Sequence, residues 1–207
     1  MKKITMKITA FRVLAAVLLC FAVTLQANAA TEGPTEQLKP TLQRLIEIVT
    51  DPALQGDAKK TERRQIIMAT VSDRFDFKEM SKRVLGPTWR EIDAQAQEEF
   101  VRQMTKLLEN NYIGQLENYS GERIEYVGER VKQERAQVST LIENKGAKYP
   151  VHYIMSKDGD KWMVYDINIE GVSLIRNYRA EFKSILLQQN FDGLMQTLVA
   201  KNKSFEQ

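Results

Sequence analysis

The stretch YDINIEGVSLIRNYRAEF, residues 165–182, changes its hydrophobic period at one glycine, Gly171. Before the glycine, apolar and polar residues alternate, which predicts a half-buried strand. After it, apolar residues recur every three or four positions, which predicts a helix that begins near Val172. Ser173 is suited to cap this helix, because its hydroxyl can accept a hydrogen bond from a backbone N–H of the first turn. The stretch is therefore a junction between a sheet and a helical region.

The same alternation occurs in three segments upstream of this strand. Together the four predicted strands span residues 124–131, 136–142, 149–155 and 162–169. Asn144-Lys145-Gly146 and Asp158-Gly159-Asp160 are strong hairpin signals between them. Gly128 interrupts the first segment where its apolar positions change, which predicts a β-bulge. We expect a four-stranded antiparallel meander over residues 122–170.

One face of each later strand is consistently apolar. In the last strand this face carries Met163, Tyr165, Ile167 and Ile169. An antiparallel sheet covered on one side divides its residues in this way. Asp166 and Glu170 then alternate onto the other face, away from the apolar surface.

Helical periodicity covers most of the remaining chain. The predicted helices span residues 38–49, 58–73, 77–85, 93–119, 172–188 and 194–199. Asp93 is a plausible N-cap for the longest of them, and Asp192-Gly193 should end the one after the sheet.

The N-terminus has the pattern of a secretory signal peptide. Residues 2–12 contain four basic residues and no acid, residues 13–25 are almost all apolar, and Ala27-Asn28-Ala29 offers small residues for cleavage after Ala29. The apolar run is too short for a transmembrane helix, which needs roughly 20 residues. We therefore expect residues 1–29 to be removed and a single domain to occupy residues 30–203.

Charge and motifs argue against several classes of function. Without residues 1–29 the chain has 26 Lys and Arg against 27 Asp and Glu, and nucleic-acid binding would require a strongly basic domain. The remaining chain has one histidine, His152, and no cysteine, so a zinc site of the usual type is not expected. It contains no phosphate-binding loop, dinucleotide fingerprint or nucleophile elbow. We expect neither enzymatic activity nor a cofactor.

Large apolar residues on facing elements leave two interpretations open. These residues could fill an ordinary core or line a cavity, and hydrophobic periodicity does not distinguish a filled core from a cavity. They are Met104, Leu108 and Tyr112 of the longest helix, the apolar face of the later strands and the apolar stripe that follows Gly171. A small cavity enzyme would need a titratable Asp or Glu on the apolar strand face. A protein-binding scaffold would instead need a large exposed apolar patch.

Several longer motifs resemble the MlaC family, the toluene-tolerance or Mla-system periplasmic phospholipid-binding proteins. They are FDFKEMSKRVLGPTWREI (75–92), EEFVRQMTKLLENNY (98–112), YPVHYIM (149–155) and WMVYDINIEGVSLIRNYRAEF (162–182), followed by FDGLMQTL. They occur in order over residues 38–203. The signal-peptide pattern agrees with this resemblance.

The resemblance implies an α+β fold in which about six or seven helices wrap a curved four-stranded antiparallel sheet and leave an apolar cavity between helices and sheet. It implies a monomeric periplasmic carrier that holds a glycerophospholipid as cargo. Its partners would be an outer-membrane lipoprotein–porin complex and an inner-membrane ABC transporter with its substrate-binding subunit. Such a carrier maintains the lipid asymmetry of the outer membrane. A hopanoid-associated branch shares the motifs and leaves the lipid's identity open.

The resemblance also implies that the apolar residues of the helices and strands line a pocket. Tyr112 and Val172 fall where the family lines its pocket. The full expected lining is Trp89, Met104, Leu108, Tyr112, Val151, Tyr153, Tyr165, Ile167, Ile169, Val172, Ile175 and Phe182. His152, Arg176 and Arg179 are candidates for its rim.

Overall fold

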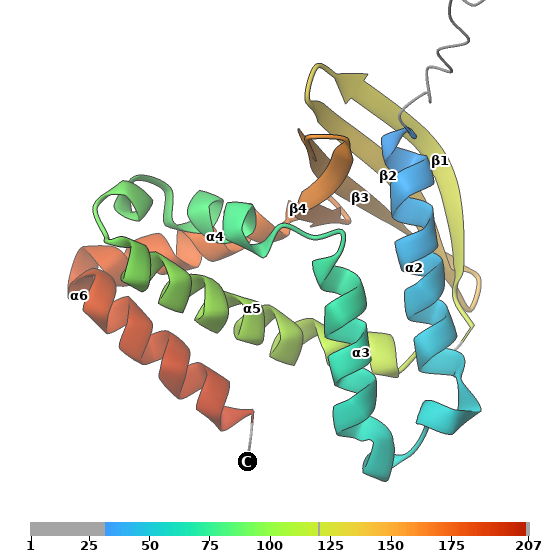
Figure 1. Cartoon of the computed structure of the whole chain (residues 1–207), viewed down its shortest axis with the longest axis horizontal. Coiled ribbons are helices and arrows are strands. Elements are labelled where there is room, and N and C mark those ends of the chain that lie inside the picture. Colours follow the sequence, from blue (N-terminus) through green and yellow to red (C-terminus); the bar gives the residue numbers. More distant parts are fainter. Residues whose placement is uncertain (1–31, 120, 206–207) are drawn as a thin grey trace, which may run out of the picture. The chain divides into compact units, whose positions relative to one another are not determined.

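The sheet is antiparallel, and its strands follow one another in chain order (Figure 1). The computed structural model describes residues 32–119 and 121–205, so the predicted signal peptide lies outside the described residues. The strands are β1 (Arg123–Lys132), β2 (Arg135–Asn144), β3 (Ala147–Asp158), β4 (Lys161–Ile169) and β5 (Val172–Ser173). The described part of the chain thus confirms the predicted meander and adds one strand to it.

The fifth strand corrects the prediction of four. Glu170 and Gly171 both have positive φ angles, 51° and 87°, and form a two-residue turn. The turn brings Val172 back to pair with Ile169, and Ser173 to pair with Asn168. A strand of two residues is too short to produce a hydrophobic period, so the sequence pattern assigned Val172 to the helix.

Two β-bulges set which side chains face inward. The bulge predicted at Gly128 is confirmed, since the β1–β2 register shifts between Tyr126 and Gly128. A second bulge lies in β4, where Ile154 pairs with Asp166 but Met155 pairs with Val164. Tyr165 is the extra residue, so the inward face of β4 changes parity there. The predicted apolar face is wrong before the bulge: Trp162 and Val164 are buried in place of Met163.

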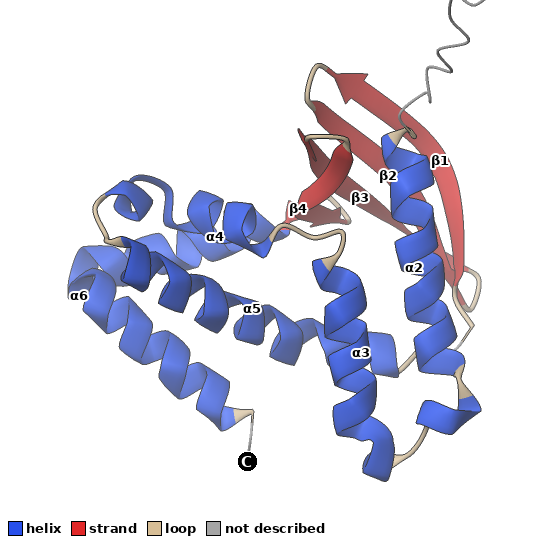
Figure 2. Ribbon diagram, viewed as in Figure 1, coloured by secondary structure: helices blue, strands red, loops and turns tan. Residues whose placement is uncertain are grey.

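Five α-helices occur in the described residues, and not the expected six or seven (Figure 2). They are α2 (Pro34–Thr50), α3 (Lys60–Ser72), α4 (Phe77–Leu85), α5 (Ala94–Glu117) and α6 (Leu174–Ser204). Three short 3₁₀ helices are η1 (Pro52–Leu54), η2 (Asp57–Lys59) and η3 (Gly86–Arg90). The count is lower because the two predicted C-terminal helices form one kinked helix.

The kink in α6 lies at Asn190, two residues before the predicted break. Asn190 has non-helical angles, φ 59° and ψ −167°. Its Oδ1 accepts from the backbone N–H groups of Asp192 (3.0 Å) and Gly193 (3.3 Å), as an N-cap does. A Cβ on Gly193 would lie 2.3 Å from the Cβ of Gln189, so the kink requires glycine there.

Side-chain caps fix the starts of three helices. Asp93 accepts from Ala96 N at 2.8 Å and begins α5, as predicted. Ser173 accepts from Arg176 N at 3.1 Å and caps α6, also as predicted. Asp76 caps α4 in the same way.

The helices cover the inner face of the sheet and extend beyond β4. α2 packs against β2 and β4, while α4, α5 and α6 pack against one another (Figure 1). The segment between α3 and α4 pairs with β4: Asp76 N donates to Val164 O, and Val164 N donates to Arg74 O, each at 2.8 Å. This backbone pairing joins the helical part directly to the sheet.

A two-arginine clamp joins α3 to α5. Glu117 accepts from Arg63 at 2.7 Å and from Arg64 at 2.8 Å, and its side chain is only 11% exposed. Burial raises the pKa of the Glu117 carboxyl, but the hydrogen bonds and charges of Arg64 and Arg63 outweigh it, and the net pKa is lowered. The two arginines therefore hold the helices together and do not form a freely solvated face.

We expect Glu117→Gln to lower the free energy of unfolding by about 2 kcal/mol, because it leaves two largely buried guanidinium groups without a counter-charge. Urea unfolding measures this. Because the folded pKa is lowered, the stabilisation should be present above the unfolded pKa of about 4.3 and be lost as the pH falls through the folded pKa. Glu47→Gln, which breaks the exposed Arg44 pair, is the control and should cost below about 0.5 kcal/mol. Equal losses in both variants would contradict the clamp.

Candidate functional site

An apolar cavity of about 450 Å³ lies between the inner face of the sheet and the helices. α2 contributes Leu42, Leu45, Ile46 and Val49, whose spacing of three and four places them on one helical face. The other wall residues are Met68, Val71, Phe75, Phe77, Met80, Leu108, Glu109, Tyr112, Ile113, Gln115, Leu116, Tyr119, Glu122, Ile124, Ile142, Asn144, Tyr149, Val151, Tyr153, Ile167, Ile169 and Leu174. Almost all of the wall is hydrocarbon or aromatic.

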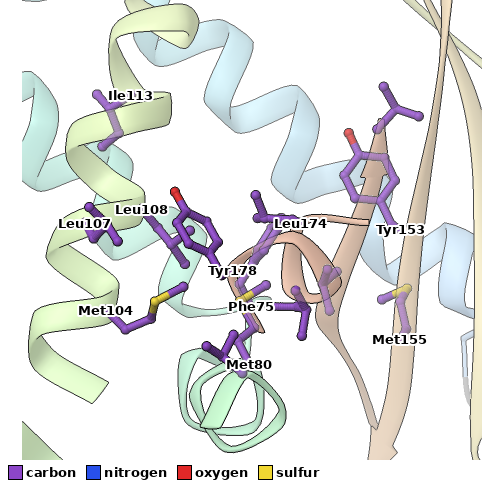
Figure 3. Packing of buried hydrophobic residues seen from close by; sticks show 14 of the residues in the cluster. Phe75, Met80, Met104, Leu107, Leu108, Ile113, Tyr153, Met155, Leu174 and Tyr178 are labelled. Atoms are coloured by element: carbon purple, nitrogen blue, oxygen red, sulfur yellow. The ribbon is translucent and has the colours of Figure 1, made fainter. Parts of the chain in front are cut away.

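Strand register builds the sheet side of the wall. Val151 lies opposite Ile169, and Tyr153 lies opposite Ile167. Successive residues of a strand point to opposite faces, so these four point inward together. In Figure 3, Tyr153 projects from a strand, while Leu108 projects from α5. The cavity is thus enclosed by elements that the chain brings together from distant positions.

Exposed wall residues mark where the cavity opens. Tyr149 is 40% exposed and Ile169 is 37% exposed, although both contribute to the wall. Ile169 precedes the β4–β5 turn, and Tyr149 lies near the start of β3. The opening is therefore at this end of the sheet.

The polar groups in the wall are few, and none of them is a cation. Asn144 donates to Glu122 Oε1 at 2.7 Å, and Tyr119 donates to the backbone oxygen of Glu122 at 2.8 Å. Burial raises the pKa of Glu109, although the charges of Arg64 and Lys106 act in the opposite direction. The wall offers no Lys, Arg or His to an anionic group inside the cavity.

Tyr112 and Tyr153 of the wall have raised pKa values and keep their rings in the apolar space. Burial raises the pKa of Tyr112, against a smaller effect of its hydrogen bond with Tyr178. Tyr178 also accepts from Asn111 Nδ2 at 2.9 Å, which links α5 to α6. Burial likewise raises the pKa of Tyr153 strongly. These phenols supply hydrogen bonds without adding charge.

Half of the expected lining residues lie in this wall. They are Leu108, Tyr112, Val151, Tyr153, Ile167 and Ile169. Their part in lipid binding stays a prediction.

The other six expected lining residues lie elsewhere. Met104, Ile175 and Phe182 pack in the core of α5 and α6. There the ring centroids of Phe182 and Phe100 lie 6.2 Å apart. Tyr165 is displaced by the β4 bulge, and the Arg83 guanidinium lies 3.9 Å from its ring centre. Val172 is 61% exposed in β5. Trp89 lines a separate recess beside η3.

The three expected rim residues also lie outside the cavity wall. His152 is on the outer face of the sheet, opposite Ser139 and Asn168. Arg176 and Arg179 are exposed on α6. Arg179 lines the recess that contains Trp89.

Sequence reasoning missed the contribution of α2 and α3 to the wall. The stripe of Leu42, Leu45 and Val49 indicated a buried helical face, but a stripe that faces a cavity has the same spacing as one that faces a filled core. Val71 of α3 gave the same ambiguous signal, and Met68 also lies in the wall.

Of the two acids close to Gly171, Asp166 supports the start of α6 and Glu170 lies in a turn. Asp166 Oδ2 accepts from the Ser173 hydroxyl at 2.6 Å, and Oδ1 accepts from Ile175 N at 3.1 Å. Asp166 therefore supports the N-terminus of α6, where a negative charge is favourable. Glu170 is exposed in the turn.

Residues 32–119 and 121–205 contain neither a metal-binding cluster nor a membrane-spanning helix. No group of three or more His, Cys, Asp or Glu side chains could hold a metal ion. Within the same ranges, no helix has the length and apolar character needed to cross a membrane.

Comparison with known proteins agrees with the motifs in the sequence. The profile of the MlaC protein family matches residues 39–200. The fold is similar to that of a phospholipid-binding protein from Ralstonia solanacearum, whose structure was solved in complex with a phospholipid. The similarity has a TM-score of 0.78 at 24% sequence identity and covers 85% of this chain and 100% of the other. No curated protein matches the chain.

We expect Asp166→Ala to lower the free energy of unfolding by about 1–2 kcal/mol, because it removes the acceptor for the Ser173 hydroxyl and for Ile175 N–H at the start of α6. Thermal and urea unfolding measure the loss. Glu170→Ala, four residues away in the exposed turn, should change stability by less than about 0.5 kcal/mol. A variant at Asp166 that is as stable as the parent would contradict the capping role.

Proposed function

The chain belongs to the MlaC family, and we propose that it binds a glycerophospholipid with its acyl chains inside the cavity. The observation that carries this proposal is the wall itself: a space of about 450 Å³ lined almost wholly by hydrocarbon and neutral aromatic side chains. Ligand sites in proteins commonly enclose roughly 300–1,000 Å³. The phospholipid in the similar Ralstonia structure supports the same ligand class.

The energy of acyl chains in water explains why the site must be enclosed. Two chains contain roughly 30 methylene groups, and exposing each costs about 0.8 kcal/mol, so full exposure would cost on the order of 25 kcal/mol. A shallow groove would leave much of this cost in place. A wall that surrounds the chains replaces the bilayer and brings the free energy of transfer close to zero.

The charges of the wall indicate where the headgroup lies. Glu109 and Glu122 are its charged residues, and a phosphate placed beside them would be repelled. We therefore expect the phosphate at the opening marked by Tyr149 and Ile169, where water can solvate it. The acyl chains, and not the headgroup, then supply most of the affinity.

The wider role that we propose is that of a periplasmic shuttle. The chain would exchange lipid with an outer-membrane lipoprotein–porin complex and an inner-membrane ABC transporter, and so maintain lipid asymmetry. The sequence has no ATP-binding loop. Because transfer from bilayer to cavity is nearly neutral in free energy, the direction of transport must come from these partners.

We expect Ile167→Glu to abolish phospholipid retention while the protein remains folded, because a carboxylate in the wall must be desolvated against acyl chains. Native mass spectrometry and lipid extraction of the purified variant measure the bound lipid, and circular dichroism checks the fold. Met163→Glu is the matched control, since it adds the same charge to the same strand at a position outside the wall. An Ile167→Glu protein with a full complement of phospholipid would contradict the proposal.

Tyr112→Ala should shorten lipid retention, because it removes an aromatic wall segment and its hydrogen bond with Tyr178. Fluorescent phospholipid transfer to acceptor liposomes should become several-fold faster. Tyr112→Phe keeps the ring and should remain close to the parent rate. Equal rates for Tyr112→Ala and the parent would remove Tyr112 from the binding surface.

A further inference from the structure

A second recess lies on the opposite side of α4 from the cavity. Phe77 and Met80 of α4 line the cavity, whereas Glu79, Lys82 and Arg83 line the recess. The recess is open to solvent and has a volume of about 500 Å³, and its remaining wall residues are Gly86, Pro87, Trp89, Arg90 and Arg179. It is therefore a separate site built from α4, η3 and α6.

The recess gathers four cationic side chains around one carboxylate. Glu79 is already engaged, with Arg83 at 2.7 Å and Lys82 at 3.4 Å. The side chains of Arg90 and Arg179 have no hydrogen bond or ion pair with any residue of 32–119 or 121–205. The wall thus has three more cations than acids, and two of its guanidinium groups are available to a ligand.

Local packing holds the Arg83 guanidinium group in place, and the Arg179 guanidinium group lies beside Gly86. Arg83 is stacked on the Tyr165 ring and bound to Glu79. Arg179 lies against Gly86, where a Cβ would come within 3.1 Å of Arg179 Nη2. Gly86 has a φ of 62°, so both its conformation and its close neighbour favour glycine. The absence of a side chain at Gly86 thus leaves space for the Arg179 guanidinium group at the recess.

The C-terminus of α4 explains only part of this arrangement. Its negative dipole end stabilises Lys82, Arg83 and the neighbouring Arg179. Arg90 belongs to η3 and has no such role. Four cations in one concavity repel one another, and an anion placed among them would relieve that repulsion.

We propose that this recess binds a phosphate-type oxyanion, either the phosphate of a lipid headgroup or inorganic phosphate. Guanidinium groups present paired N–H donors that match the oxygens of phosphate. Inorganic phosphate carries up to two negative charges near neutral pH and a phosphodiester headgroup carries one, so either anion offsets part of the excess of three cations. The site is independent of acyl-chain binding in the cavity.

The two tryptophans of the chain provide a reporter and an internal control. Trp89 lines the recess, while Trp162 is buried in β4. The test is NMR of the two indole N–H signals in lipid-loaded protein during titration with inorganic phosphate, glycerol 3-phosphate, or chloride at matched ionic strength. A saturable shift of the Trp89 signal, without a shift of Trp162, is expected with the phosphates and not with chloride.

Substitutions of the recess arginines test whether the shift of the Trp89 signal comes from binding in the recess. Arg179→Gln and Arg90→Gln should each weaken phosphate binding about tenfold, as expected for the loss of a charge-assisted hydrogen bond. Arg176→Gln removes the same charge from α6, one turn away and outside the recess, and should leave phosphate affinity unchanged. Bound lipid should stay constant in all three variants, which separates this test from that of the cavity.

The ligand series distinguishes the two sources of phosphate. Tighter binding of glycerol 3-phosphate than of inorganic phosphate supports a lipid headgroup, and equal or weaker binding supports free phosphate. The proposal is overturned if chloride gives the same shift, if neither phosphate shifts the Trp89 signal, or if Arg179→Gln lowers thermal stability without changing phosphate affinity. The last result would leave Arg179 as a stabiliser of the α4 C-terminus alone.

Discussion

The structure depends on keeping an apolar space of about 450 Å³ open between helices and sheet. If it were closed and empty, such a space would cost on the order of 10 kcal/mol at the rate measured for cavities in protein cores. That cost is comparable with the whole net stability of a typical domain, about 5–15 kcal/mol. The walls must therefore be held by interactions outside the cavity, and an apolar occupant would stabilise the folded chain.

Polar contacts at the edges of the wall hold its helices and strands in place. Glu117 joins α3 to α5 through two arginines, and Tyr178 joins α6 to α5 through Asn111. At the N-terminus of α2, Thr35 N donates to Glu129 of β1 at 2.8 Å. Each contact fixes two elements that both contribute to, or directly support, the wall. The cavity can remain apolar because the hydrogen bonds and ion pairs that hold its walls lie outside it.

Local chemistry made much of the fold predictable from the sequence. Hairpin residues and alternation predicted the four long strands, Gly128 marked a bulge, and Ser173 and Asp93 marked helix starts. The bulge at Tyr165 carries no glycine, so the inward face of β4 was misassigned there. Half of the expected wall was misplaced for a related reason: apolar spacing identifies a buried face but not the space that it faces. The partner of Arg63 and Arg64 lies more than 50 residues away, beyond the reach of local patterns.

The occupant of the cavity is the central claim, and native mass spectrometry of the protein purified from its native cells tests it most directly. The account predicts a mass above that of the chain, and lipid extraction that identifies the difference as glycerophospholipid. A hopanoid in the extract would keep the carrier and change its cargo. A protein that carries no lipid, and that gains none when incubated with phospholipid vesicles, would contradict the account.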